Sequence, residues 1–184
     1  MTVSVLSSPN ARTTLSIVAL AIFSVLFSFG FACAVPLAAF AAISSMSFDR
    51  RKALAATGVV WLANQAVGFL FLHYPTDGET LAWGAALGAI ALLSCEVSGL
   101  VTRRVAGVGG ACAAFLAAFA AYEGSLFLIN AAIGQTVEHF ALPVVSRIFL
   151  INACAFGGMW ALKTIASSTE FGRRLTAGLS ARHA

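Results

Sequence analysis

Apolar residues follow one another along this chain in six runs, and short polar segments separate the runs. A helix that crosses the hydrocarbon layer of a membrane needs about 20 consecutive, mostly apolar residues. Four of the runs reach or exceed that length, and the first two are shorter. The pattern predicts an all-α, polytopic membrane protein with six transmembrane helices. The predicted spans are residues 14–29, 32–48, 53–72, 81–101, 105–133 and 142–165.

The junction between the first two runs is the least clearly marked. It consists of a turn around Gly30 and carries no charged residue. A single bent or re-entrant element is therefore an alternative to two separate spans at this point.

Basic residues mark alternate junctions. Ten of the eleven Lys and Arg residues lie before the first run, after the second, after the fourth, and at or beyond the end of the sixth. Positively charged segments are retained in the cytoplasm during membrane insertion. The alternation predicts that both chain ends are cytoplasmic, which requires an even number of spans. The ten residues are Arg12, Arg50, Arg51, Lys52, Arg103, Arg104, Lys163, Arg173, Arg174 and Arg182.

The composition agrees with this class. Hydrophobic residues make up 60% of the chain and charged residues only 10%, whereas a soluble domain carries about 25% charged residues. The net charge of +4 is spread over short flanks, which indicates contact with anionic lipids rather than with nucleic acid. We expect a multi-pass protein of the bacterial inner membrane. Residues 1–13 would form a cytoplasmic N-terminus without a cleavable signal, residues 14–165 the transmembrane domain, and residues 166–184 a basic cytoplasmic tail.

Polar side chains within the predicted spans suggest where a ligand would bind. Buried polar groups are costly in the hydrocarbon layer and usually face the interior of the helix bundle. The third span carries a stripe at positions i, i+3, i+4 and i+7, and most other such residues fall in the outer half of the bundle. The stripe is Trp61, Asn64, Gln65 and Gly68, and the further candidates are His73, Tyr74, Tyr122, Glu123, Asn130, His139 and Arg147.

Structural roles compete with binding at several of these positions. Arg147 is the one basic residue on the predicted outer side, and an ion pair with Glu138 or Glu123 would close the outer end of the bundle. His73 and Tyr74 also suit a membrane interface, where such side chains act as anchors. Glu96, near the inner end, is expected to pair with Arg103 or Arg104.

The small-residue motif and the cysteines indicate structural roles and no reactive site. Gly84 and Gly88 form a GxxxG motif, whose ordinary role is close packing of helices within the bundle. The four cysteines lie in separate spans without CxxC spacing, as expected of small buried apolar side chains. They are Cys33, Cys95, Cys112 and Cys154. The sequence contains no catalytic set of residues and no nucleotide-binding motif, so we expect a protein that is not an enzyme and has no cofactor.

One stretch of the chain resembles a known protein family. Residues 48–88 combine an Arg-Arg pair at the start of the third span, the segment Trp61-Leu62-Ala63-Asn64-Gln65-Ala66-Val67-Gly68 and the loop His73-Tyr74-Pro75. This stretch is similar to the substrate-binding S-components of energy-coupling-factor (ECF) vitamin transporters, and most of all to the solitary BtuM-type proteins implicated in cobalamin uptake. Elsewhere the resemblance rests on topology and composition alone.

The resemblance implies a vitamin-type substrate, in this group cobalamin or a related corrinoid, bound in an outward-facing cavity. It also implies either solitary action or an ECF-type partner with a transmembrane and an ATPase module. Imidazole and thiolate groups can ligate the corrinoid cobalt. The family places a cysteine in the outer loop, where this chain instead has His73, so His73 is the candidate axial ligand and Cys33 the fallback.

Two other classes remain open. The first is a stand-alone secondary transporter or metal-ion permease, with ion or proton sites at Glu123, Glu138, His139 and Arg147. The second is a membrane assembly factor that transports nothing and binds no small molecule.

Overall fold

The computed structural model describes residues 9–31, 35–135 and 140–168, and these ranges are helical apart from their connections. Apolar runs and polar junctions in the sequence correspond to helices and turns. The helices are α1 (Pro9–Phe31), α2 (Leu37–Ser47), α3 (Arg50–Leu70), α4 (Gly78–Thr102), α5 (Gly107–Ala132) and α6 (Leu142–Ser168).

Four of these helices are long and apolar enough to cross a membrane. They are α3, α4, α5 and the segment Leu142–Ile165 of α6. Large apolar side chains such as Leu128 and Leu150 lie exposed on their outer faces, as expected where lipid rather than water surrounds the protein. These apolar helices indicate a multi-pass membrane protein in contact with the lipid bilayer.

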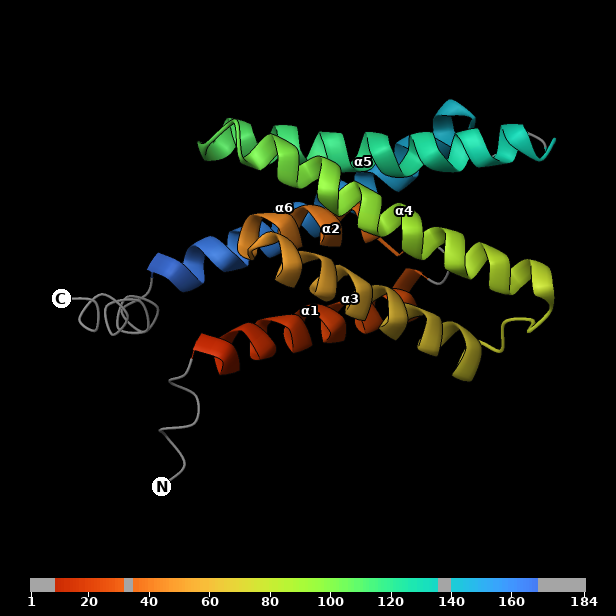
Figure 1. The fold of residues 1–184 in the computed structure, drawn as a ribbon, viewed down its shortest axis with the longest axis horizontal. Helices are drawn as coiled ribbons and strands as arrows, with labels where there is room; N and C mark the ends of the chain where they lie inside the picture. Colours follow the sequence, from red (N-terminus) through yellow and green to blue (C-terminus); the bar gives the residue numbers. More distant parts are fainter. Residues whose placement is uncertain (1–8, 32–34, 136–139, 169–184) are drawn as a thin grey trace, which may run out of the picture.

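Helix α2 is short and lies at the centre of the bundle. Its 11 residues extend for only about 16 Å at 1.5 Å per residue, whereas the predicted span covered residues 32–48. Residues 37–44 are all buried, and α2 packs against α3, α4, α5 and α6. Figure 1 shows it inside the bundle, with α1 along one edge beside α3 and α5 along the other. Four alanines in this segment leave room for such close neighbours.

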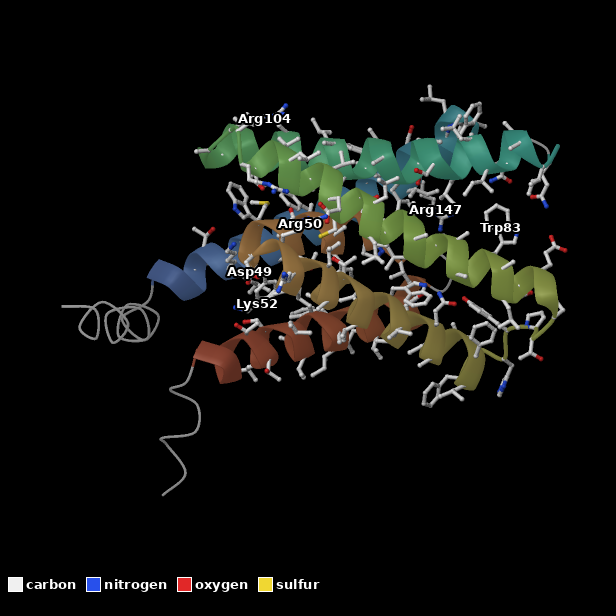
Figure 2. The ribbon with its side chains drawn as sticks, in the orientation of Figure 1. Asp49, Arg50, Lys52, Trp83, Arg104 and Arg147 are labelled. Carbon is white, nitrogen blue, oxygen red and sulfur yellow. The ribbon has the colours of Figure 1, made fainter. Side chains whose placement is uncertain are left out.

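The basic junctions gather at one end of the bundle. The α2–α3 and α4–α5 connections lie at the end where α1 begins and α6 finishes, and the α3–α4 loop lies at the opposite end (Figure 1). Figure 2 places Arg50, Lys52 and Arg104 at this end and Trp83 toward the other. We call these the basic end and the loop end.

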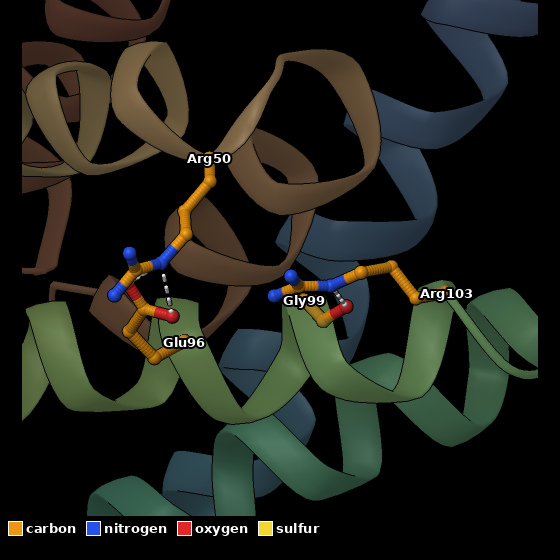
Figure 3. Close-up of polar contacts among 4 residues, drawn as sticks. All are labelled: Arg50, Glu96, Gly99 and Arg103. Carbon is orange, nitrogen blue, oxygen red and sulfur yellow. Dashed lines mark hydrogen bonds and ion pairs between the residues drawn. The ribbon is translucent and has the colours of Figure 1, made fainter.

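Two arginines at the basic end make different polar contacts. The Arg50 guanidinium donates from Nε to both oxygens of Glu96, at 2.7 and 3.0 Å, and so links α3 to α4 (Figure 3). Arg103 instead donates to the carbonyl oxygen of Gly99, 2.9 Å away on its own helix. The prediction that Glu96 pairs with Arg103 or Arg104 is therefore wrong, because the chain reversal before α3 brings Arg50 alongside α4.

The cysteines differ in their surroundings. Cys95 is buried, whereas Cys112 and Cys154 are exposed on α5 and α6. The expectation of buried side chains is thus correct for Cys95 and wrong for the other two, whose thiols lie on outward faces of the helices. Cys33 lies outside the described residues.

Candidate functional site

A cavity of about 350 Å³ opens toward the loop end between α2, α3, α4, α5 and α6. Its volume lies within the range of roughly 300–1,000 Å³ that small-molecule sites occupy. Aromatic, amide and aliphatic side chains share its wall. The lining residues are Val35, Leu37, Asn64, Gln65, Phe69, Tyr74, Thr80, Trp83, Gly84, Leu87, Tyr122, Glu123, Leu126, Ile148 and Asn152.

One wall is formed where α3 packs against the two glycines of α4. The Trp61 indole donates from Nε1 to the carbonyl oxygen of Gly84, at 2.9 Å. A Cβ atom on Gly88 would lie 2.5 Å from the Trp61 ring, and one on Gly84 would lie 2.7 Å from the Gln65 side-chain oxygen. The GxxxG motif therefore serves packing within the chain, as predicted. This packing fixes Gln65, which lines the cavity, and Trp61, which lies next to the lining residue Gly84 but does not line the cavity itself.

The loop after α3 folds Tyr74 back over the cavity. His73 has a backbone φ of 56°, a left-handed conformation that costs a non-glycine residue energy. The turn allows the Tyr74 N–H to donate to the carbonyl oxygen of Gly68, at 3.0 Å. A Cβ on Gly68 would lie 2.6 Å from the Tyr74 ring, and that ring meets Phe69 edge to face at 6.3 Å. The loop thus presents Tyr74 to the cavity.

Asp77 fixes the start of α4, which brings Thr80 to the cavity. The Asp77 carboxylate accepts from the Thr80 backbone N–H at 2.9 Å and from the Thr80 hydroxyl at 3.1 Å. Both bonds stabilise the ionised carboxylate and lower the pKa of Asp77 below its ordinary value, the backbone bond most. This is the N-cap expected of an Asp before a helix.

The N-terminus of α2 is capped from another helix. Pro36, the residue before α2, supplies no side-chain cap. The Asn152 side chain on α6 accepts from the Ala39 N–H at 3.1 Å, and its amide nitrogen donates to the carbonyl oxygen of Ile148 at 3.0 Å. Both functional groups of the buried Asn152 amide are therefore satisfied beside the cavity.

Tyr122 and Glu123 of α5 complete the opposite wall. Tyr122 is 8% exposed. Glu123 is half-buried, and its Oε1 is buried without a hydrogen-bond partner among the described residues. An unpaired buried carboxylate oxygen is unusual, which makes Glu123 the most distinctive chemical group of the cavity.

The structure brings together five of the predicted site residues. These lie on α3, on the α3–α4 loop and on α5, and all of them line the cavity. They are Asn64, Gln65, Tyr74, Tyr122 and Glu123.

The other candidates lie elsewhere. The His73 side chain is exposed and Arg147 is exposed on α6, and neither lines the cavity. Asn130 is buried and does not itself line the cavity; it donates to the carbonyl oxygen of Leu126, a lining residue of the same helix. His139 and the fallback ligand Cys33 lie outside the described residues. Among the described residues, no group of three His, Cys, Asp or Glu side chains could hold a metal ion.

Several lining residues were not among the predicted site residues, four of them on α4. These four, Thr80, Trp83, Gly84 and Leu87, follow a helical spacing, so a stripe that included aromatic side chains would have predicted Trp83. Phe69 continues the α3 face one turn beyond Gln65. Asn152 is a polar residue within the predicted sixth span, but nothing in the sequence signals that it caps α2.

No family model matches this chain, and no curated protein and no solved structure matches it either.

Proposed function

We propose that this protein is the substrate-binding subunit of a membrane uptake system and that it holds a small organic molecule in the loop-end cavity. The cavity of about 350 Å³ is the observation that carries the proposal. Its wall combines apolar area with a few convergent polar groups, the usual make-up of a small-molecule site. The resemblance of residues 48–88 to vitamin-binding S-components supports the same class.

In the proposed topology all six helices lie in the membrane region, with both chain ends in the cytoplasm. The gathering of basic junctions at one end of the bundle supports this orientation, because basic segments stay cytoplasmic. The cavity then opens to the outside. Helix α2, too short to cross alone, forms the core around which the longer helices pack.

The ligand we propose is smaller than a corrinoid. A corrin ring with its side chains and nucleotide loop exceeds a cavity of about 350 Å³. The candidate cobalt ligand His73 is also exposed and is not among the lining residues. A vitamin-sized molecule with ring and hydrogen-bonding groups matches the aromatic and amide side chains of the wall.

Native mass spectrometry of the purified full chain in detergent tests the proposal. We expect a co-purified small molecule that is lost from Asn64→Ala and kept by Asn130→Ala, a matched change at a residue that does not line the cavity. Retention by both variants would contradict a site in this cavity. A visible spectrum of the same sample with corrinoid bands would overturn the proposed size limit.

Cysteine labelling tests the topology. In a background without the native cysteines, Asp77→Cys should react with a membrane-impermeant maleimide added to intact cells, and Arg51→Cys should react only after lysis. The opposite result would place the cavity on the cytoplasmic side and would contradict uptake from outside.

A further inference from the structure

Glu123 is the one acidic residue among the described residues that line the cavity. Of the described residues that line the cavity, Glu123 alone has a side chain that is charged in water at neutral pH. Its Oε1 has no hydrogen-bond partner among the described residues, and no basic residue of that part of the chain forms an ion pair with it. Burying a carboxylate without a partner is costly. A positively charged group placed in the cavity would offset this cost.

Aromatic rings make up much of the remaining wall. Phe69, Tyr74, Trp83 and Tyr122 all line the cavity. The face of an aromatic ring attracts a cation within about 6 Å of its centre, and Trp is the most effective of these residues. Rings together with one carboxylate form the combination that recognises ammonium groups.

The polar groups at the start of α2 do not offer an equivalent site for an anion. A helix N-terminus favours negative charge when its N–H groups are free. Here the Ala39 N–H donates to Asn152 and the Leu37 N–H donates to the carbonyl oxygen of Val35, at 2.8 Å. The amide nitrogen of Asn152, which lines the cavity beside them, already donates to the carbonyl oxygen of Ile148, at 3.0 Å.

We infer that the ligand is an organic cation whose positive group lies against Glu123 and the surrounding aromatic rings. This inference rests on the proposed function and names the substrate class of the same cavity. The cation pairs with the Glu123 carboxylate, and the apolar part of the molecule packs against the aliphatic side of the wall. Leu87, Leu126 and Ile148 supply that side.

Three aromatic probes of similar size test the inference on the full chain in detergent. They are benzyltrimethylammonium, which is cationic at every pH, uncharged phenylpropanol and anionic phenylpropionate. Isothermal titration calorimetry should give a dissociation constant about tenfold lower for benzyltrimethylammonium than for phenylpropanol, as expected for a desolvated cation–π and ion-pair contact. Equal affinities, or tighter binding of phenylpropionate, would overturn the inference.

Substitutions test which residues cause the preference for benzyltrimethylammonium over phenylpropanol. Glu123→Gln should abolish the tenfold preference, Glu123→Asp should retain most of it, and Glu96→Gln at the basic end should leave it unchanged. Trp83→Leu should reduce the preference more than Trp160→Leu, which lies outside the cavity. An unchanged preference in Glu123→Gln would overturn the inference. Glu123→Asp is the control for folding, because it also alters the side chain but keeps the carboxylate.

The two proposals can fail separately. If native mass spectrometry finds a neutral or anionic molecule that Asn64→Ala releases, the cavity is a binding site and only the cationic class is wrong. If no molecule co-purifies and none of the three probes binds, the proposed function fails, and the cation inference fails with it.

Discussion

The Asn152 side-chain oxygen accepts a hydrogen bond from the backbone N–H of Ala39, 113 residues earlier in the chain. The bond joins α6 to the first turn of α2, the buried central helix. The first N–H groups of any helix lack partners within the helix, and a side chain from the preceding residues normally supplies one. Here Pro36 precedes the helix and cannot do so. A residue of a distant helix therefore takes the role of a cap.

Asn152→Ala should destabilise the protein by about 1–3 kcal/mol, because it leaves a buried N–H of α2 without an acceptor. Thermal unfolding in detergent, followed by circular dichroism, measures the effect. Asn130→Ala is the matched control, since among the described residues the Asn130 amide donates to a carbonyl of its own helix, that of Leu126. A smaller loss for Asn152→Ala than for Asn130→Ala would contradict the capping role.

Gly88→Ala should cost about 1–3 kcal/mol, the usual range for overpacking. Its new methyl group would lie 2.5 Å from the Trp61 ring, which a hydrogen bond to Gly84 holds in place. Gly58→Ala on α3 is the control, because nothing lies within 4 Å of its Cβ position. The melting temperatures of the two variants should diverge. If both matched the parent protein, the contact between Trp61 and Gly88 would not be tight.

His73→Gly should stabilise the protein by about 1 kcal/mol or slightly less, since glycine adopts a positive φ without the strain that a side chain brings. The Tyr74 N–H bond to Gly68 would remain. Denaturant unfolding checks the stability, and native mass spectrometry checks the bound molecule. Loss of that molecule on His73→Gly would show that the imidazole binds it, as the sequence alone suggested.

Much of the fold could be predicted from the sequence because lipid imposes a simple rule. Long apolar runs must become helices there, since no water is present to satisfy the backbone. Four long helices followed from that rule, and the gathering of basic junctions at one end followed from their alternation with non-basic junctions along the chain. The shortness of α2 did not, because residues 37–47 are apolar whether they face lipid or protein. Their burial depends on contacts with four helices that no local pattern reveals.

The site could be predicted in part for a similar reason. Asn64, Gln65, Tyr122 and Glu123 stand out because polar groups in an apolar span need an interior location. The role of His73 as a ligand stays a prediction, since the residue is exposed and outside the lining, and what the structure adds is its left-handed backbone conformation. Trp83 was missed because an aromatic residue in an apolar helix carries no polar signal.

Acid should weaken the start of α4 through Asp77. The bonds from the Thr80 N–H and hydroxyl hold the pKa of Asp77 below its ordinary value of 3.8. In the unfolded chain the carboxylate therefore takes up a proton at a higher pH than in the folded protein, and folding gains stability from the ionised group. That contribution is complete above the ordinary pKa and is lost as the pH falls through the lower, folded value.

Asp77→Asn isolates this effect, because an amide oxygen can still accept from the Thr80 N–H but does not titrate. We expect the melting temperature of the parent protein to exceed that of Asp77→Asn at neutral pH, and the gap to close as the pH falls below the ordinary value of 3.8. Asp49, whose pKa is lowered mainly by its hydrogen bond with Lys52, is present in both proteins and cancels in the comparison. A gap that stayed constant or widened in acid would contradict the assignment. Once Asp77 is protonated, it no longer has the extra stability that the ionised carboxylate gives over an amide, so the two proteins should become alike.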